Sequence, residues 1–366
     1  MKISVINSVC VHNDAISKSV YDQIQWLREL GHEVLFFCYK CEYEQIHHCI
    51  VQNTVEILQN EHYKQSKVVI FHFGIYYELF NLIRLSSATL SRSIVVFHNI
   101  TPPKLQPKDK LELIYLSLGQ LHNLNFADLV ICDSRFNLEC ISELCNSRKI
   151  VLDLPVAIPN FSIAQKKSAF DGTIRILYIS RFVKSKNPED LLDAIGSLIS
   201  RQPSLKIEVT FVGNSIFSDE AILSSVKNKS DQINNVQSNV KVFIRTDITE
   251  KEKWSLIEET DIFVLPSEHE GFAVPVLEAL SRYCRVITYD NTNLRFIGGN
   301  LVNRVETRNV EQLTLSILEN IRIIQSISWQ THGFHEYSTK CDSYLRIFDP
   351  ERIKRKFYTL VFGPLT

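Results

Sequence analysis

A chain of 366 residues is too long for one ordinary hydrophobic core and suits two domains of roughly 100–200 residues each. Its 40 basic and 41 acidic residues leave a formal net charge of −1, which excludes the broad basic surface of a nucleic-acid-binding protein. Hydrophobic residues make up 45% of the chain and charged residues 22%, a composition that excludes a disordered protein.

The cysteine content indicates a reducing compartment. The chain has nine cysteines, an odd number, and several lie inside apolar runs, so we expect free thiols in a cytoplasmic protein. The first apolar run is broken at Asn7 and Ser8, which predicts a first strand rather than a signal peptide. No stretch of about 18 apolar residues occurs, so any membrane contact is expected to be peripheral, on the cytoplasmic face.

The first half of the chain alternates short apolar runs with longer amphipathic stretches. The clearest helix is predicted at 19–30, where Val20 and Ile24 share one stripe and Gly31 is a stop signal. Alternating strands and helices predict a parallel sheet in a domain that spans 1–158. The buried strands are predicted at 3–6, 34–38, 68–71, 94–97 and 129–132.

The second half repeats this architecture. A stretch at 155–172 carries two prolines and no sustained period, which predicts a linker, assigned to 159–172. We expect a second domain at 173–345, in which strand signals stop after Val302, and a C-terminal helix at 346–366 that packs back on the first domain. The second domain has strands predicted at 174–179, 207–212, 240–244 and 262–265, with helices near 188–200 and from Thr249.

The segment 261–288 holds the most informative pattern. A buried strand leads into Pro266 and Ser267, a polar turn follows, and a helix is predicted to begin within 272–275. In a parallel sheet the turn and the positive end of this helix lie at the carboxyl edge of the strands. The backbone amides there are expected to form an anion site.

Charged side chains flank this expected anion site. Glu270 precedes the helix and Glu278 lies within it, and carboxylates accept hydrogen bonds from the hydroxyl groups of a sugar or a ribose. Arg181 and Lys186 follow the strand at 174–179, and their cations suit the oxygens of a diphosphate. The pattern therefore predicts a ligand that combines phosphate with hydroxyl groups.

Together these motifs resemble those of the family 4 retaining glycosyltransferases, which have the GT-B fold. Three motifs carry the resemblance in the second half: E-x7-E as Glu270 to Glu278, P-S-x-x-E-G-F at 266–272, and Arg-x4-Lys as Arg181 and Lys186. The first half resembles one branch of the family in N-D-A-I at 13–16, F-H-F-G at 71–74, F-H-N-I-T-P at 97–102 and D-S-R-F-N at 133–137. The resemblance implies an α/β protein of two Rossmann-like, doubly wound parallel-sheet domains facing each other across a cleft, with the C-terminal helix crossing back to the first domain.

The resemblance also implies a role for each matching residue. Arg181 and Lys186 would neutralise the donor diphosphate, and Glu278 would hold the ribose. His98, at the end of a first-domain strand, would face the sugar and act in catalysis with Glu270, Arg181 and Lys186. Further donor contacts are expected from Ser267, Gly271, Phe272 and Ala273, and contacts with the acceptor or the sugar from Asp14, His72, Asn99 and Ser134.

The activity that the family implies is that of a hexosyltransferase-type enzyme of polysaccharide biosynthesis. It would move a sugar from a nucleotide sugar to a hydroxyl acceptor, a glycan or a lipid-linked glycan, with retention of configuration. The sequence has no Asp-x-Asp motif, so we expect neither a metal ion nor another cofactor. Glu268, His269 and Glu270 are adjacent on one turn and are not expected to converge on an ion.

Simpler explanations and other functions stay open at this point. Arg181 and Lys186 alone fit a solvated loop, and His98 and His72 fit hydrogen-bonded core histidines. The sites would also suit a GT-B-like phosphorylase or epimerase, which product analysis with the donor alone distinguishes. A non-catalytic nucleotide-sugar-binding partner of a transferase would bind the donor without turnover.

A membrane contact is the last expectation. Lys104, Lys108 and Lys110 precede the apolar stretch 111–118, a combination that suits docking to an anionic membrane. A plain surface helix is the simpler explanation of the same pattern.

Overall fold

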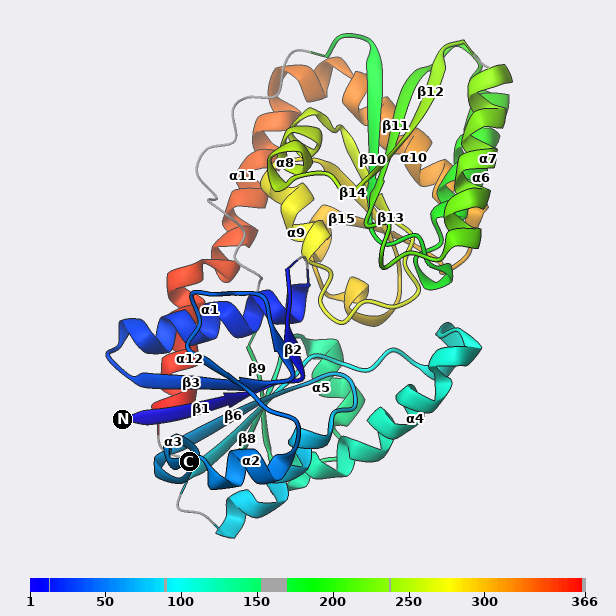
Figure 1. The fold of residues 1–366 in the computed structure, drawn as a ribbon. Coiled ribbons are helices and arrows are strands. Elements are labelled where there is room, and N and C mark those ends of the chain that lie inside the picture. Colours follow the sequence, from blue (N-terminus) through cyan, green and yellow to red (C-terminus); the bar gives the residue numbers. More distant parts are fainter. Residues whose placement is uncertain (13, 89–90, 153–169, 237, 364–366) are drawn as a thin grey trace. The chain divides into compact units, whose positions relative to one another are not determined.

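The computed structural model describes residues 1–12, 14–88, 91–152, 170–236 and 238–363, which form two compact units (Figure 1). Unit 1 comprises Met1–Ala157 and Phe348–Thr366, and unit 2 comprises Ile158–Ile347. Most of the linker expected at 159–172 lies outside the described residues.

Unit 1 is built on a seven-stranded sheet of order β5-β3-β1-β6-β7-β8-β9, in which every pairing is parallel. The strands are β1 (Lys2–Ile6), β3 (Glu33–Cys38), β5 (His48–Ile50), β6 (Val68–Phe73), β7 (Arg92–Phe97), β8 (Leu129–Cys132) and β9 (Arg148–Val151). The five predicted strands are confirmed. The edge strands β5 and β9 escaped prediction because they are short and lack a buried apolar run. A separate short pairing joins β2 (Val9–Cys10) and β4 (Lys40–Cys41).

Helices cover both faces of the unit 1 sheet. The long helix α1 (Ala15–Glu29) begins before the predicted residue 19 because the Asp14 carboxylate caps it, accepting a hydrogen bond from the Ser17 amide at 2.8 Å. On the other face, Phe80 packs against Phe71 and Phe73 in the hydrophobic core. The remaining helices before the linker are α2 (Thr54–Gln59), α3 (Glu61–Gln65), η1 (Glu78–Ala88), η2 (Pro103–Leu105), η3 (Lys108–Lys110), α4 (Leu111–Gly119), η4 (Gln120–Phe126) and α5 (Arg135–Ile141), where η marks short 3-10 helices.

The last helix, α12 (Pro350–Phe362), packs on unit 1 beside α1 (Figure 1). Phe357 is fully buried, and its ring meets the ring of Trp26 edge to face with 5.7 Å between centroids. The Tyr358 hydroxyl donates a hydrogen bond to the Trp26 carbonyl oxygen at 2.6 Å. The C-terminal helix thus returns to the first unit.

Unit 2 is built on a six-stranded parallel sheet of order β12-β11-β10-β13-β14-β15. The strands are β10 (Thr173–Ile179), β11 (Lys206–Gly213), β12 (Val240–Thr246), β13 (Ile262–Leu265), β14 (Arg285–Tyr289) and β15 (Val302–Val305). Strand order reverses between β10 and β13, the switch point at which doubly wound sheets bind ligands. The expectation that strands stop after Val302 is wrong: Val302 opens β15, whose polar Asn303 and Arg304 conceal it in the sequence.

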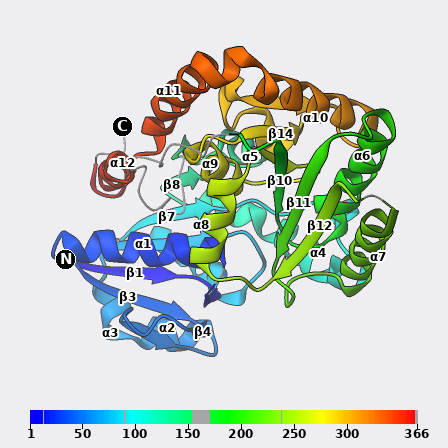
Figure 2. The ribbon, with the colours of Figure 1, turned by 90° about the horizontal axis from the view of Figure 1, so that it is seen from above.

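Two layers of helices sandwich the unit 2 sheet (Figures 1 and 2). One face carries α6 (Pro188–Arg201), α7 (Glu220–Val236) and α10 (Val310–Gln325), and the other carries α8 (Glu250–Glu259), α9 (Val274–Ser281) and α11 (Phe334–Leu345). The shorter elements are the 3-10 helices η5 (Lys184–Lys186), η6 (Thr292–Arg295), η7 (Gly299–Leu301) and η9 (Arg346–Phe348), and the π-helix η8 (Trp329–Gly333).

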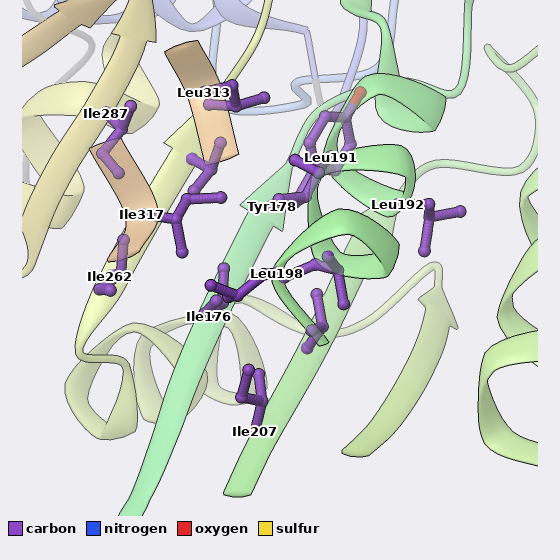
Figure 3. Packing of buried hydrophobic residues seen from close by; sticks show 14 of the residues in the cluster. Ile176, Tyr178, Leu191, Leu192, Leu198, Ile207, Ile262, Ile287, Leu313 and Ile317 are labelled. Atoms are coloured by element: carbon purple, nitrogen blue, oxygen red, sulfur yellow. The ribbon is translucent and has the colours of Figure 1, made fainter. Parts of the chain in front are cut away.

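The core of unit 2 holds its strands in fixed register (Figure 3). Ile176 and Tyr178 of β10 pack with Ile262 of β13 against the helices on the first face, which contribute Leu191 and Ile317. The exposed fraction of each of these residues is at most a few per cent. The packing therefore fixes where β10 and β13 end, and with that the loops that follow them.

The structure bears on two expectations from the sequence, the state of the cysteines and the presence of a membrane-spanning helix. The nine cysteines are all free thiols in the structure. In the ranges that the structure describes, no helix combines the length and the apolar character needed to cross a membrane.

Candidate functional site

The loops that follow β10 and β13 are bound to one another at the switch point of unit 2. The amide of Glu268 donates to the Ser185 carbonyl oxygen at 2.8 Å, and the side-chain amide of Asn187 donates to the Pro266 carbonyl oxygen at 2.9 Å. Asn187 adopts a left-handed conformation, with φ 44°, which lets α6 begin directly after this loop. The two loops therefore form one rigid rim at the carboxyl edge of the sheet.

A buried ion pair lies at the centre of this rim. The Lys186 ammonium donates to Oε1 of Glu270 at 2.7 Å and to the carbonyl oxygen of His269 at 2.7 Å. The side chains of Lys186 and Glu270 are only 10% and 15% exposed. Burial lowers the pKa of Lys186 below its ordinary value, although the attraction of Glu270 opposes the shift and the nearby charge of Arg181 adds to it. An additional anion beside Lys186 would favour its charged form and so offset the effects of burial and of the Arg181 charge.

Arg181 supplies a second cation at the same edge. Its side chain is exposed, and within the described chain its guanidinium forms no hydrogen bond or ion pair. Its backbone is fixed to the core, because the hydroxyl of buried Tyr178 donates to the carbonyl oxygens of Arg181 at 3.2 Å and Lys186 at 3.4 Å. Arg181 therefore combines a fixed backbone with a side chain that is able to reach a ligand.

The helix α9 begins at Val274, four residues after Glu270. Ala273 precedes it in a left-handed conformation, φ 73°, and Pro275 occupies its first turn, as the sequence predicts. The amide of Glu270 donates to the Thr292 hydroxyl at 3.1 Å, and the Asn293 side chain donates to the Phe272 carbonyl oxygen at 2.7 Å. These bonds hold the turn that carries Gly271 and Phe272.

Ser267, which sequence reasoning placed among the donor contacts, lies inside the turn. Its side chain is fully buried, and its hydroxyl donates to the carbonyl oxygen of His269 at 3.1 Å. The structure thus gives Ser267 the task of shaping the turn, and a contact with the donor stays a prediction.

Glu278 has a partner that sequence reasoning missed. Lys253 of α8 donates to Oε1 of Glu278 at 2.9 Å, and the Glu278 carboxylate is buried beneath it. Burial raises the pKa of Glu278 above its ordinary value, although the charge of Lys253 opposes the shift. The pKa of Lys253 is also raised, because the attraction of Glu278 and Glu250 outweighs the lowering effect of burial. Lys253 belongs to a helix that was predicted, but no spacing in the sequence connects that helix to Glu278.

A second network supports the rim from the side of α6. Arg308 donates to Oδ1 of Asp190 at 2.8 Å, and its Nε lies 3.6 Å from Oε1 of Glu268. The hydroxyl of Tyr289 also donates to Asp190. The pKa of Asp190 is raised by burial, against the opposing hydrogen bond from Tyr289 and the charge of Arg308. These residues carried no recognisable signal in the sequence.

Unit 1 has its own polar cluster at the carboxyl edge, where three neighbouring strands end. His72 is near the end of β6, His98 follows β7, and Asp133 follows β8. Nδ1 of His98 lies 2.5 Å from Oδ2 of Asp133, and Nε2 of His98 lies 2.9 Å from Nδ1 of His72. The His98 side chain is 3% exposed, so both of its ring nitrogens are engaged inside the protein.

This cluster is incompletely satisfied. In the described part of the chain, Nε2 of His72 and Oδ1 of Asp133 are buried without a hydrogen-bond partner. Burial and the neighbouring His98 hold the pKa of His72 well below its ordinary value, so His72 stays neutral. Sequence reasoning selected both histidines, whereas Asp133 stood only in a matching motif and its contact with His98 was not foreseen.

The other residues expected to touch the acceptor or the sugar have local structural partners. The side-chain amide of Asn99 donates to Oδ1 of Asn137 at 2.8 Å, and Ser134 caps α5 by accepting from the Asn137 amide at 3.1 Å. Asn99 and Ser134 are buried, and Asp14 caps α1. Their contact with a substrate stays a prediction.

In the described ranges, no group of three or more His, Cys, Asp or Glu side chains is arranged to hold a metal ion. Glu268 and His269, which adjoin Glu270 in sequence, have partners of their own: Glu268 accepts from Asn187 at 3.2 Å, and the His269 carbonyl accepts from Lys186.

Part of the chain, including the unit 2 site, matches a model of a known protein family. Residues 160–322 match the family model described as Glycosyl transferases group 1. The matched range contains the loops after β10 and β13, with Arg181, Lys186, Glu270 and Glu278. The match covers less than half of the chain and includes the whole of the candidate site of unit 2.

One curated relative gives a more particular comparison. The chain is 25% identical over 258 residues to the O-antigen chain mannosyltransferase B of Escherichia coli. The match covers 66% of this chain and 63% of that protein, so it spans less than two thirds of the relative's length.

Solved structures resemble the chain over nearly its whole length. A glycosyltransferase from Rickettsia africae ESF-5 aligns with a TM-score of 0.73 and 15% identity over 99% of this chain and 98% of that one. The α,α-trehalose 6-phosphate synthase from Burkholderia multivorans aligns at 0.71 and 10% identity, over 98% and 96% of the two chains. The sucrose-phosphate synthase from Thermosynechococcus elongatus aligns at 0.70 and 15% identity, over 98% of each. The likeness shows the fold: two Rossmann-like domains of the GT-B type.

The neutral state of buried His72 predicts a pH dependence of stability. Because the folded-state pKa lies below the ordinary value near 6.5, the unfolded chain takes up a proton that the folded chain does not, and stability falls as pH drops below about 6.5. The slope from this group approaches about 1.4 kcal/mol per pH unit. His72→Gln should remove it. The measurement is urea unfolding at pH 7.5, 6.5 and 5.5 in a Trp254→Phe, Trp329→Phe background, where Trp26 reports on unit 1 alone.

The control for this experiment is His47→Gln, which removes an exposed imidazole from the same unit and should keep the wild-type slope. An unchanged slope in His72→Gln would show that His72 titrates equally in both states.

Proposed function

We propose that this chain is a glycosyltransferase that moves a sugar from a nucleoside-diphosphate sugar to a hydroxyl acceptor, with retention of configuration and without a metal ion. The observation that carries the proposal is the convergence of Lys186, Arg181 and Glu270 at the switch point of unit 2. The group 1 match over 160–322 and the GT-B fold support it.

The two cations suit the chemistry of the leaving group. When the bond between the sugar and the diphosphate breaks, negative charge develops on a phosphate oxygen, and cations held beside that oxygen stabilise the transition state. Lys186 is fixed by Glu270 and by the His269 carbonyl, so little reorganisation is needed at the moment of reaction. Arg181 adds a planar guanidinium fork for a second pair of oxygens.

The carboxylates and the α9 turn complete the donor site in this proposal. Glu278 accepts from the ribose hydroxyls with the oxygen that Lys253 does not hold, and Glu270 addresses the sugar. The turn of Gly271 and Phe272 leads into the positive end of α9, which favours the anionic phosphates. Ala273 belongs to the same turn.

The cluster of unit 1 serves the sugar end in this proposal. Asp133 accepts from Nδ1 of His98 and so fixes the tautomer and the ring plane of His98. Nε2 of His98 is bonded to His72 in the free protein, and a sugar hydroxyl would have to replace that bond. His98 is therefore the catalytic residue of this unit, with Asp133 and His72 as its positioning residues.

The relative that the chain resembles supports a substrate class for this proposal. The name O-antigen chain mannosyltransferase B supports a hexosyl donor and a glycan acceptor in polysaccharide biosynthesis. We further propose, without support from that name, that the acceptor is a glycan or a lipid-linked glycan and that the protein acts in the cytoplasm, peripherally on the membrane. The acceptor is expected at the loops of unit 1, since loops at the ends of strands carry binding residues.

Replacement of the buried Lys186 should distinguish a role of its charge in the reaction from a role of the loop in the fold. Lys186→Met keeps the length of the side chain and removes its charge, and should lower kcat/KM by about 10²–10³-fold, as should Arg181→Ala. The thermal stabilisation by the best of UDP-, GDP-, ADP- and dTDP-sugars should shrink in both variants. The matched control is Lys184→Met, an exposed neighbour in η5 that should retain wild-type activity.

Two results would contradict the proposal. An equal loss of kcat/KM in Lys184→Met and Lys186→Met would show that the loop has a structural role and that the charge of Lys186 has no special role in the reaction. Donor binding without turnover on any acceptor would identify a non-catalytic binding partner instead.

Removal of metal ions tests the charge stabilisation independently. If Lys186 and Arg181 neutralise the diphosphate, activity should be unchanged, within about twofold, after dialysis against a chelator. Loss of activity in chelator that added Mg²⁺ or Mn²⁺ restores would refute the metal-free reaction.

A further inference from the structure

The carboxylate of Glu278 is held by a lysine that lies outside every motif of the sequence. Lys253 comes from α8 and Glu278 from α9, two helices on the same face of the unit 2 sheet (Figures 1 and 2). The Lys253 ammonium donates to Oε1 of Glu278 at 2.9 Å and lies 2.9 Å from Oε2 of Glu250, one turn away on α8. It also lies over the ring of Trp254, 5.4 Å from the centroid. Three contacts therefore fix this cation against one oxygen of Glu278.

This contact affects both the charge of Glu278 and the oxygen that it can offer to a ligand. The side chains of Lys253 and Glu278 are only 17% and 10% exposed. Burial raises the pKa of Glu278, the negative charge of Glu250 adds to the rise, and Lys253 opposes both. Without the cation, the buried carboxyl group would take up a proton more readily and would accept hydrogen bonds less strongly. Since Lys253 occupies Oε1, Oε2 is the oxygen that would accept from a ligand.

The attachment of α8 to α9 does not account for this pair. A second ion pair joins the same two helices, with Nε of Arg282 3.1 Å from Oε1 of Glu258. The Glu258 carboxylate is 56% exposed, so it keeps most of its hydration. A buried ion pair contributes little net stability, because removing both charges from water offsets their attraction. The buried position of Lys253 therefore points to a role that it exerts through Glu278.

We propose that Lys253 is a positioning residue that gives the donor site its selectivity for ribose over 2′-deoxyribose. Lys253 keeps Glu278 ionised and fixed through Oε1, so that Oε2 accepts from the ribose 2′-hydroxyl. A 2′-deoxy ligand lacks this hydroxyl and leaves a buried carboxylate oxygen without a donor, which is unfavourable for a charged group. The inference rests on the proposed function, and it makes ribonucleoside diphosphate sugars the donors and 2′-deoxyribonucleoside diphosphate sugars poor ones.

The test is isothermal titration calorimetry of the full-length protein at pH 7.5 with UDP, GDP and ADP, and with dUDP, dGDP and dADP. The ribonucleotide that binds best should bind the wild type about 10- to 100-fold more tightly than its 2′-deoxy counterpart. In Lys253→Met the ratio of the two affinities should fall to within about threefold of one, because mainly the ribonucleotide loses affinity. Lys253→Arg keeps the charge and should restore most of the ratio.

Two further measurements distinguish positioning from a role in folding. In Lys253→Met the ratio should rise again from pH 6 to pH 8.5, because Glu278 loses its proton as the pH passes its raised pKa. The two ligands share one diphosphate group, so the titration of that group cancels in the ratio. Glu278→Gln should abolish the ratio, and adding Lys253→Met should lower it no further. A residue that only supports the fold would lower both affinities alike and would change neither the ratio nor its pH profile.

Two control variants change the same helices without touching Glu278. Lys251→Met removes an exposed lysine of α8, and Arg282→Met removes the other ion pair between α8 and α9. Both should keep the wild-type ratio. Circular dichroism and thermal melting verify the fold of every variant, and Lys253→Arg and Glu278→Gln test the proposal even if Lys253→Met is unstable.

The outcomes that overturn the proposal are distinct from those that overturn the proposed function. A wild type that binds a ribonucleotide and its 2′-deoxy counterpart equally, or Lys253→Met with the wild-type ratio, would remove the role of Lys253 and leave the donor site intact. A wild type that binds none of the six nucleotides would remove the donor site itself, and this inference with it.

Discussion

The ion pair between Lys186 and Glu270 is the interaction on which the candidate site depends. It joins the loops after β10 and β13, and both of its side chains are largely removed from solvent. Removing a lysine from water is unfavourable unless a carboxylate and further acceptors surround it, and here Glu270 and the His269 carbonyl do so. The remaining cost shows in the lowered pKa of Lys186, which an incoming diphosphate would offset.

The surrounding structure holds this pair in place through several independent contacts. Tyr178 fixes the first loop from within the core, Asn187 ties it to Pro266, and Arg308 bridges Asp190 and Glu268 at its flank. The carboxyl ends of adjacent parallel strands converge by geometry, so the fold alone brings the loops together. The hydrogen bonds then set the distance between charged atoms, which electrostatic stabilisation of a transition state requires.

Much of this could be predicted from the sequence, and the failures have physical reasons. The buried central strands and the start of α9 were predicted because apolar runs and Pro275 have direct local causes. The polar edge strand β15 could not be predicted, because an edge strand needs no continuous apolar run. Arg181, Lys186 and Glu270 were selected from spacing, whereas Lys253 and Asp133 act through tertiary contacts with Glu278 and His98 that no local pattern encodes.

A crystal structure of the protein with the nucleoside diphosphate that stabilises it most tests the central claim directly. The account predicts phosphate oxygens within about 3 Å of the Lys186 ammonium and the Arg181 guanidinium, beside the N-terminus of α9. A diphosphate bound away from the ends of β10 and β13, with Lys186 still engaged only by Glu270 and His269, would contradict it.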